Sequence, residues 1–420
     1  IFSAIEEFKA QVSSEVAAEA IFNEAFQAFL LAVVIAGVFQ VIAGFINGGI
    51  IGYYFPSSVI KGMLAGIGIT IFLKEIPHAL GYDKDLEGDF QFFQMDGENT
   101  FSEIFNALGN PDLGATLIAA LGLAILIFWQ QGFMQRLKIF TYLQGPLVAI
   151  LGGIALVYAF KGGSHEMIAE HLVNVPVAES ASEFFGLFTF PNFNAIVNPL
   201  VWKTAAVIAI VASLETLLCV EATDKMDPEK RTTPTNLELK AQGVGNILSG
   251  LIGGLPITQV IVRSSANIQS GGKTKMSAIF HGFFIFAFVA FLPQVLNLVP
   301  RASLAAILLI VGYKLAKPET FKAMWSEGKA QFIPFIITIV FIVFKDLLWG
   351  VGIGLVVAVL EILYINYKKP YLLDVDLDKD DNVYNFLLAE DVTFLHKANI
   401  METLSKVPDG SAVTIDGSKS

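Results

Sequence analysis

The side chain with the clearest chemical potential is a carboxylate inside a long apolar run. Glu215 lies near the middle of Lys203–Met226, which at about 1.5 Å per residue is long enough to cross a hydrocarbon layer as a helix. A carboxylate at the bilayer centre costs on the order of 3 kcal/mol, so it tends to face a cavity and to serve a function. We therefore expect Glu215 to carry a proton or to bind another cation. The alternative is a structural contact with Arg263 or with a backbone donor.

Two neighbours of Glu215 are candidates for the same cation-coupling role. Cys219 lies one helical turn further along on the same face, and Thr216 follows Glu215 directly. A thiol is a poor ligand for a hard cation, and hydroxyl groups in membrane helices often bond back to their own backbone. Packing is thus the alternative for Cys219, and local backbone bonding is the alternative for Thr216.

A break in the next apolar run could present backbone donors to an anion. The run Val244–Leu255 ends in Gly253-Gly254-Leu255-Pro256, and a short segment carrying Arg263 follows, closed by Gly271-Gly272. An interrupted helix at membrane depth is tolerated only where it lines a cavity or is buried in protein, and its amino end offers unpaired N–H groups. The sequence therefore predicts an anion site at the start of a second half-helix.

Four consecutive residues and one nearby cation make up the predicted anion site. We expect the anion to bind at Thr258, Gln259, Val260 and Ile261. The Thr258 hydroxyl would assist the backbone donors, and Arg263 would draw anions into the pocket or balance Glu215. A purely structural pairing is the alternative for Arg263.

The composition is that of a membrane protein. Of the 420 residues, 54% are hydrophobic, only 15% are charged and 36 are Phe, so the chain could not fold in water without exposing large apolar areas. The formal net charge is −11, but in a membrane protein the side of the bilayer that holds the basic residues matters more. The one cysteine, Cys219, excludes a disulfide within the chain.

The sequence lacks the motifs of enzymes and of metal sites. Four histidines, His78, His165, His281 and His396, have no paired spacing with Cys, Asp or Glu that suggests a metal site. No serine elbow and no phosphate-binding glycine loop occurs. We therefore expect no enzyme activity and no catalytic residue. We also expect no nucleic-acid partner, no metal site and no cofactor, apart from H⁺ or Na⁺ that is transported together with the anion.

Eleven apolar runs recur along the chain, and they predict an all-α polytopic membrane protein. The runs are about Ala25–Ile46, Ser57–Leu80, Leu113–Gln130, Ile139–Phe160, Lys203–Met226, Gly243–Leu255, Ile257–Ser270, Met276–Leu292, Ala302–Leu315, Phe332–Phe344 and Leu347–Tyr367. Several are shorter than the roughly 20 residues that a straight span needs, which favours tilted, packed or half-crossing helices in a large bundle.

The distribution of Lys and Arg indicates the orientation in the cell membrane. If the runs alternate in direction, one set of junctions holds fifteen basic residues and the opposite set holds seven. This bias puts the carboxy-terminal tail in the cytoplasm and the acidic loops Gly81–Asp112 and Lys161–Trp202 outside. Four acidic residues near the cytoplasmic end of the Glu215 run are expected to be solvated: Glu221, Asp224, Asp227 and Glu229.

A sharp change in composition after Lys368-Lys369-Pro370 predicts a membrane domain over residues 1–369 and part of a soluble α/β module over 370–420. In the second part, Asp374–Asp381 is a charged linker or hairpin, Tyr384–Leu388 alternates like a strand, and Ala398–Lys406 has helical spacing. The chain starts at Ile1 without a methionine and ends in a strand-like stretch, so we expect it to be a fragment whose earlier helices are missing.

Several motifs occur in a fixed order. They are Ser213-Leu214-Glu215-Thr216-Leu217-Leu218, Gln242-Gly243-Val244-Gly245-Asn246, Gly253-Gly254-Leu255-Pro256, Arg263-Ser264-Ser265-Ala266-Asn267 and Gly271-Gly272, with helix starts at Pro56–Gly62 and Pro300–Ala306. Together they resemble the sulfate permease (SulP) family of anion transporters. Phe394–Ala398 and Ile415–Ser418 look like the first half of the cytoplasmic STAS domain of that family.

The resemblance implies fourteen helices in two inverted seven-helix repeats, core and gate subdomains that move against each other, and a homodimer. The eleven runs would be helices four to fourteen, and the anion would lie between half-helices three and ten, lined also by one and eight. Glu215 matches a cation-coupling or substrate-lining acidic position, where the sodium-dependent bicarbonate carriers of the family have Asp. Pro56 and Gly68 are spaced as Pro300 and Gly312, as expected of corresponding helices in two repeats.

These observations favour a secondary active transporter of sulfate or bicarbonate, with dicarboxylates as further candidates, coupled to H⁺ or Na⁺ and working by alternating access. A divalent anion that enters a negative cell must climb roughly 2.3 kcal/mol per charge per 100 mV, so an accompanying cation is expected. An anion exchanger or channel is the alternative within transport. A membrane sensor or scaffold that acts through its cytoplasmic module is the alternative outside it.

Overall fold

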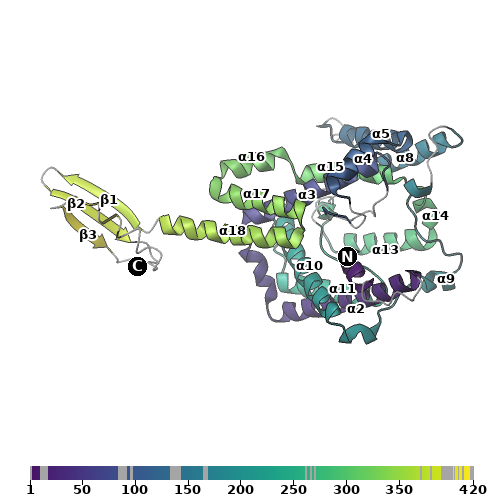
Figure 1. Cartoon of the computed structure of the whole chain (residues 1–420), viewed down its shortest axis with the longest axis horizontal. Coiled ribbons are helices and arrows are strands. Elements are labelled where there is room, and N and C mark those ends of the chain that lie inside the picture. Colours follow the sequence, from purple (N-terminus) through teal and green to yellow (C-terminus); the bar gives the residue numbers. More distant parts are fainter. Residues whose placement is uncertain are drawn as a thin grey trace.

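The structure is a computed structural model of the whole chain. It describes residues 2–9, 18–83, 92–94, 98–132, 143–163, 169–260, 263–264, 267–268, 271–368, 371–378, 381–388, 401, 403–404, 406–408 and 411–416. Within these ranges the chain is mainly helical, with a small sheet at the carboxy-terminal end (Figure 1).

Ten of the eleven predicted apolar runs correspond to helices, although α11 starts eight residues before its predicted run and α8 starts six residues after the start of its run. The other run, Ile257–Ser270, has no regular structure up to residue 260 and lies partly outside the described residues. The helices are α2 (Ala18–Phe45), α3 (Ser57–Ala79), α5 (Leu113–Trp129), α8 (Gly145–Phe160), α10 (Pro199–Met226), α11 (Thr235–Leu251), α13 (Met276–Phe291), α15 (Arg301–Leu315), α17 (Lys329–Phe344) and α18 (Leu347–Lys368). Three described segments, Phe22–Phe45, Pro199–Asp224 and Leu347–Tyr364, are long and apolar enough to cross a membrane. α5 forms a fourth candidate together with α4 (Thr100–Gly109), to which it is bent by 110°.

Two of these helices cross at the glycines that the sequence spacing had paired. α3 begins directly after Pro56, and α15 begins directly after Pro300. A Cβ atom added to Gly68 would lie 2.7 Å from the Gly312 carbonyl oxygen, and one added to Gly312 would lie 2.7 Å from the Gly68 carbonyl oxygen. The two backbones therefore meet face to face at equivalent positions, which a larger residue would prevent.

α3 and α15 each pack against a pair of helices, and the two sets of contacts have the same pattern. α3 packs on α17 and α18, whereas α15 packs on α5 and α8. α17 packs on α18, and α5 packs on α8. Figure 1 shows α3, α5, α8, α15 and α17 together in the upper half of the view. These contacts form one bundle. In it α3 corresponds to α15, α17 to α5 and α18 to α8, as expected of inverted repeats.

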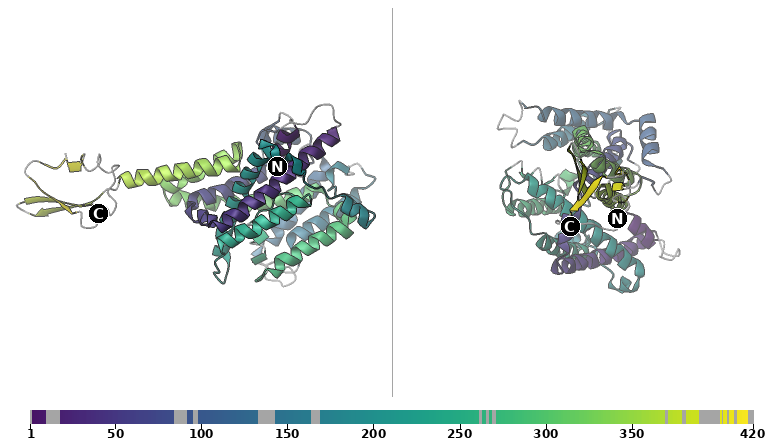
Figure 2. Two further views of the ribbon diagram at one scale, coloured as in Figure 1. Left: turned by 90° about the horizontal axis from the view of Figure 1, so that it is seen from below. Right: turned by 90° about the vertical axis from the view of Figure 1, so that its left-hand side faces the viewer.

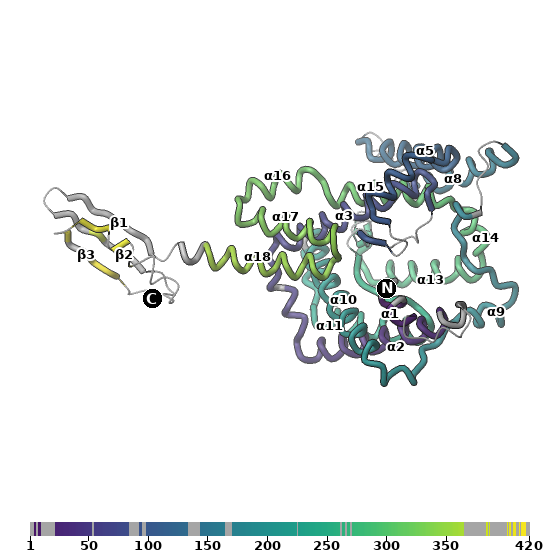
Figure 3. The backbone as a smooth tube through the Cα atoms, viewed as in Figure 1, coloured from purple at the N-terminus to yellow at the C-terminus, as the bar shows by residue number. Residues whose placement is uncertain are grey.

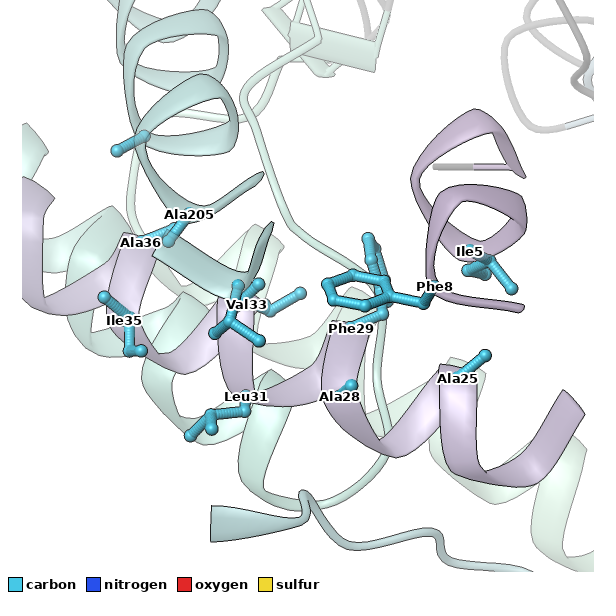
Figure 4. Packing of buried hydrophobic residues seen from close by; sticks show 13 residues of the cluster. Ile5, Phe8, Ala25, Ala28, Phe29, Leu31, Val33, Ile35, Ala36 and Ala205 are labelled. Atoms are coloured by element: carbon cyan, nitrogen blue, oxygen red, sulfur yellow. The ribbon is translucent and has the colours of Figure 1, made fainter. Parts of the chain in front are cut away.

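A second group of helices consists of α1 (Phe2–Lys9), α2, α10 and α11. α2 and α11 approach as closely as α3 and α15 do, since a Cβ on Gly37 would lie 2.5 Å from the Gly243 carbonyl oxygen. The apolar core of this group contains Phe8 of α1, Phe29 of α2 and Ala205 of α10, all buried (Figure 4). The tube in Figure 3 and the left view of Figure 2 show α2, α10 and α11 side by side.

Shorter helices occupy the connections, where no helix was predicted. They are η1 (Gly48–Tyr54), α4, η2 (Ala169–His171), α9 (Ala181–Gly186), η3 (Phe193–Val197), α14 (Pro293–Leu296) and α16 (Pro318–Ser326). α4 starts at a capping box, in which the Asn99 side chain and the Ser102 side chain each bind the backbone of the other. A buried ion pair of 3.2 Å between Glu103 of α4 and Lys74 of α3 fastens this helix to the bundle.

The carboxy-terminal part contains three strands, reached from the end of α18 (Figure 1). β1 (Tyr371–Asp378) pairs antiparallel with β2 (Asp381–Leu388), with Tyr371 opposite Leu388. β2 pairs in parallel with β3 (Ala412–Asp416), and the order is β1-β2-β3. The hairpin interpretation of the acidic stretch is thus confirmed, with a second strand longer than predicted. Most of the predicted helix Ala398–Lys406 lies outside the described residues.

Candidate functional site

The expected break after α11 is present, and two glycines and a serine shape it. α11 ends at Leu251, and residues 254–260 have no regular secondary structure. Gly253 has a φ of +91°, in the region that favours glycine, and a Cβ there would lie 2.7 Å from the Thr189 carbonyl oxygen. The Gly254 N–H donates to the Ser249 carbonyl oxygen at 2.7 Å, and the Ser249 hydroxyl donates to the Leu255 carbonyl oxygen at 2.7 Å.

Amide side chains from two helices hold the broken segment in place. The Ile257 N–H donates to Asn246 Oδ1 at 2.6 Å, and the Ile257 carbonyl oxygen accepts from Asn246 Nδ2 at 3.3 Å and Gln242 Nε2 at 3.0 Å. Gln242 Nε2 also donates to the Ala212 carbonyl oxygen of α10 at 3.1 Å. Because an unpaired buried polar group is costly, these bonds fix the segment between α10 and α11.

The same network reaches α2. Asn246 Nδ2 donates to Gln40 Oε1 at 2.7 Å, and Gln40 Nε2 donates to the Ser213 hydroxyl at 3.2 Å. Gln40 and Asn246 are almost completely buried. Sequence reasoning missed Gln40, although an amide deep inside the apolar run of α2 is a signal that could have found it.

A chain of hydrogen bonds connects the segment to α10 near the predicted carboxylate. The Gln259 N–H donates to Thr216 Oγ1 at 3.1 Å, and Thr216 Oγ1 lies 3.0 Å from Thr258 Oγ1. The Thr258 hydroxyl in turn hydrogen-bonds the carboxylate of Glu215, which is half-buried. The Thr258 hydroxyl also donates to the Ala212 carbonyl oxygen at 3.5 Å. With Glu215 ionised, that hydroxyl can donate to the carboxylate instead, and a chain then runs from the Gln259 N–H through Thr216 and Thr258 to Glu215.

The backbone N–H groups of the segment alternate between paired and free. Ile257 and Gln259 donate to Asn246 and Thr216, as described above. Within the described part of the chain, the N–H groups of Thr258 and Val260 have no acceptor. Two unpaired donors two residues apart, beside a helix break, are a suitable arrangement for an oxyanion.

Thr223 of α10 connects two of the predicted residues, the side chain of Gln259 and the backbone of Cys219. Gln259 Nε2 donates to Thr223 Oγ1 at 3.2 Å and to Ser264 Oγ at 3.4 Å. The Thr223 hydroxyl donates to the Cys219 carbonyl oxygen at 2.7 Å, and the Cys219 side chain is buried. The side chain of Gln259 is therefore tied to α10 about two turns beyond Glu215.

The structure does not bring Arg263 to Glu215. Arg263 is exposed, in a helical turn with Ser264, and among the described residues it forms no ion pair. The Glu215 side chain interacts with the Thr258 hydroxyl instead. Ile261 lies outside the described residues. Of the predicted residues, Glu215, Thr216, Thr258, Gln259 and Val260 thus lie together. Arg263 follows on the same segment, where its neighbour Ser264 contacts Gln259, but it forms no ion pair with Glu215 among the described residues.

The expectation that the acidic residues at the end of α10 are solvated is wrong for Asp227, while Asp224 is half-buried. Asp227 is buried, and Arg231 donates to both of its carboxylate oxygens, at 2.7 Å and 3.1 Å. This hydrogen bonding holds the pKa of Asp227 well below its usual range. Asp224 accepts from the N–H and hydroxyl of Thr233 at 2.8 Å and 2.7 Å. The two carboxylates therefore shape the turn after α10.

A cavity of about 330 Å³ lies beside this turn. Its lining includes Leu217 and Val220 of α10, Glu221 and Asp224 one turn later, and Thr235 at the start of α11. Its lining residues include Leu217, which follows Thr216 in the chain, but neither Glu215 nor Thr216.

Comparisons with known proteins show which family the chain belongs to. The family model described as "Sulfate permease family" matches residues 3–338. The Bacillus subtilis (strain 168) protein YvdB, named as a sulfate transporter, is 30% identical over 78% of this chain and 58% of its own length. The bicarbonate transporter BicA of Picosynechococcus is 26% identical over 84% of this chain and 58% of its own length. The chain thus spans less than two thirds of these relatives.

Two solved structures show the fold. The transmembrane domain of a cyanobacterial bicarbonate transporter, BicA, matches with a TM-score of 0.59 at 23% identity, covering 85% of this chain and 80% of that one. The overall structure of SLC26A9 matches with a TM-score of 0.67 at 15% identity, covering 98% of this chain and 67% of that one. The helical part therefore has the fold of these membrane proteins, an all-α arrangement with an inverted repeat.

Proposed function

The chain belongs to the sulfate permease family, which consists of membrane anion transporters and not of enzymes, and we propose that it carries sulfate or bicarbonate across the cell membrane. The names of YvdB and BicA support these two substrates. In our proposal the anion binds at the free N–H groups of Thr258 and Val260, in the break between two helical segments.

The observation that carries the proposal is the hydrogen-bond chain from the Gln259 N–H through Thr216 and Thr258 to Glu215. It gives the carboxylate a physical connection to the backbone that would bind the anion. An ionised Glu215 with no cation beside it repels an anion at Thr258. A proton or Na⁺ on Glu215 removes this repulsion, so anion and cation bind better together than apart, which is the basis of symport.

The two helix groups support alternating access. The binding segment is fixed to α2, α10 and α11 by the bonds of Gln40, Gln242 and Asn246, so it would move with that group as a unit. The bundle built around the α3–α15 crossing would be the other body. Movement of one group against the other would expose the anion first on one side of the membrane and then on the other.

The remaining parts of the proposal concern assembly and orientation. The strand order β1-β2-β3, with one antiparallel and one parallel pair, supports a STAS-like module at residues 370–420. With the distribution of Lys and Arg, this supports a cytoplasmic carboxy terminus. We also propose a homodimer, on the family resemblance.

The test is uptake into proteoliposomes that contain the natural full-length protein. Labelled sulfate and labelled bicarbonate are offered under pH and sodium gradients, and we expect gradient-driven uptake of one of them. Glu215→Gln should abolish the effect of the gradient while exchange of anion for anion persists. Glu361→Gln, which changes a carboxylate on α18, is the matched control and should behave as the unmodified protein. No uptake of either anion would contradict transport, and gradient-driven uptake by the Glu215 variant would contradict coupling through Glu215.

A further inference from the structure

Four lysines surround α16, the short helix between α15 and α17. Lys314 is in the last turn of α15, Lys317 is the N-cap of α16, Lys322 is within α16, and Lys329 starts α17. All four are exposed. In the part of the chain that the structure describes, none of them forms an ion pair with a carboxylate.

Other basic side chains in the structure do have such partners. Lys61 pairs with Glu327 at 2.8 Å, and Lys203 pairs with Glu7 at 3.1 Å. The first of these pairs also neutralises Glu327, which lies between α16 and α17. Glu319 then remains as the one other acidic residue in the segment 314–329. Four positive charges and this one negative charge leave a net charge of +3 around α16.

Exposed aromatic side chains accompany the lysines. Trp325 of α16 is 64% exposed and stacks edge-to-face on Phe332 of α17, with ring centroids 4.9 Å apart. Tyr313, next to Lys314, is also exposed. The opposite face of α16 packs on the bundle through the fully buried Met324. Trp and Tyr beside Lys are typical of the level where lipid headgroups meet hydrocarbon.

The position of α16 fits that level. α17 exposes Ile333 and Val340, which form an apolar face suited to hydrocarbon. The lysines lie at the end of that face, and Figure 1 shows α16 at the end of the helical part from which α18 leads to the strands. Positive charges at the edge of a hydrocarbon-facing surface are complementary to anionic headgroups.

We propose that Lys314, Lys317, Lys322 and Lys329, with Trp325 among them, form a docking surface for the anionic headgroups of membrane phospholipids. This α16 surface is separate from the cluster around Glu215 and does not depend on which anion is transported. Bound headgroups would offset the mutual repulsion of the lysines and hold α16, and through it the α15–α17 connection, at the membrane surface.

The test measures lipid binding by the full chain in mixed phosphatidylglycerol and phosphatidylcholine. Native mass spectrometry counts the phosphatidylglycerol molecules that the protein retains. The double variant Lys317→Gln/Lys322→Gln should bind phosphatidylglycerol roughly 25-fold more weakly, at about five-fold per lysine. The control Lys161→Gln/Lys345→Gln removes two exposed lysines that lie elsewhere and should leave binding unchanged. Equal binding by the unmodified and the α16 variant proteins, or an equal loss in the control, would overturn the proposal.

A second measurement needs no change in the lysines. Brominated phosphatidylglycerol should quench the tryptophan fluorescence of the unmodified protein more than brominated phosphatidylcholine does, and the difference should shrink in high salt. Trp325→Phe should remove this difference between the two lipids. If quenching by the two lipids is the same, or if Trp325→Phe leaves the difference intact, then α16 does not bind anionic headgroups.

Discussion

The hydroxyl oxygens of Thr216 and Thr258 lie 3.0 Å apart, although 42 residues separate them in the sequence. Thr216 is on the continuous helix α10, and Thr258 is in the broken segment that follows α11. Their contact joins the residue next to Glu215 with the predicted anion-binding residues. This contact therefore helps to fix the broken segment against α10, together with the bonds of Gln242 and Asn246.

Replacing Thr216 should weaken the binding of the transported anion. Thr216→Val keeps the shape of the side chain but leaves the Gln259 N–H and the Thr258 hydroxyl without their partner, at a cost of about 1–3 kcal/mol. We expect about ten-fold weaker apparent affinity in proteoliposome uptake. Thr216→Ser keeps the hydroxyl and should stay close to the unmodified protein.

A matched control for this change lies in the other bundle. Thr70 is also buried, and its hydroxyl donates to the Gly66 carbonyl oxygen of its own helix. Thr70→Val should leave the apparent affinity unchanged. An equal loss of affinity in Thr70→Val and Thr216→Val would contradict a specific role for the Thr216–Thr258 contact.

The amide network should show strong coupling between α2 and α11. Gln40 and Asn246 share a buried hydrogen bond of 2.7 Å, so Gln40→Leu alone leaves a buried donor on Asn246 unpaired. We expect each single change, Gln40→Leu or Asn246→Leu, to lower the free energy of unfolding by about 2 kcal/mol. The double variant should lose at least 0.5 kcal/mol less than the sum. Thermal unfolding in detergent measures the stability of the unmodified protein, the two single variants and the double variant. If the stability losses of the single variants add up to that of the double variant, the two side chains do not act together.

Much of the helical framework was predictable because apolar runs and breaks leave clear signals. Gly253 and Pro256 placed the interruption, and the shared spacing of Pro56–Gly68 and Pro300–Gly312 indicated that α3 and α15 correspond, although it did not predict that they cross. Contacts between side chains on different segments depend on the rotation of each segment about its own axis, and these contacts were not predictable. Arg263 was expected close to Glu215, but the orientation of its segment is set by Asn246 and Thr216, which composition does not reveal.

The short helix α16 and the ion pair of Asp227 were missed for a similar reason. Both lie in connections between the long helices, where the segments are too short to show a recognisable hydrophobic periodicity. Asp227 and Arg231 are four residues apart, a spacing at which opposite charges also pair on a continuous helix. Here α10 ends at Met226 and the turn after it is also held by Asp224 and Thr233, so the spacing alone does not reveal how the pair forms.

Enlarging Gly68 should destabilise the crossing of α3 and α15. The added methyl group of Gly68→Ala would lie 2.7 Å from the Gly312 carbonyl oxygen, so the helices must separate, at a cost of about 1–3 kcal/mol. Gly352→Ala on α18 is the control, because a Cβ there meets nothing within 4 Å. That control should be neutral or stabilising by up to about 1 kcal/mol. Equal melting temperatures for the two variants would contradict a close crossing.

The contact of His171 with Asp83 should make one connecting segment sensitive to pH. His171 Nδ1 lies 2.6 Å from one Asp83 oxygen, and His78 Nδ1 lies 2.7 Å from the other. The hydrogen bond to Asp83 raises the pKa of His171, although burial opposes the shift. Burial tends to raise the pKa of Asp83, but the hydrogen bonds from His171 and His78 outweigh it and lower the pKa.

The sign of both shifts gives the pH range in which this contact is stable. Because the pKa of His171 is raised, its contribution is full below the ordinary value of 6.5 and is lost as pH rises through the folded-state pKa. Because the pKa of Asp83 is lowered, its contribution is present above 3.8 and is lost only in stronger acid. Amide exchange at Leu172–Val175, corrected for the intrinsic effect of pH, should thus be slower at pH 6 than at pH 8.5. His171→Gln should remove most of this difference, and a difference unchanged by that substitution would assign the pH effect to another group.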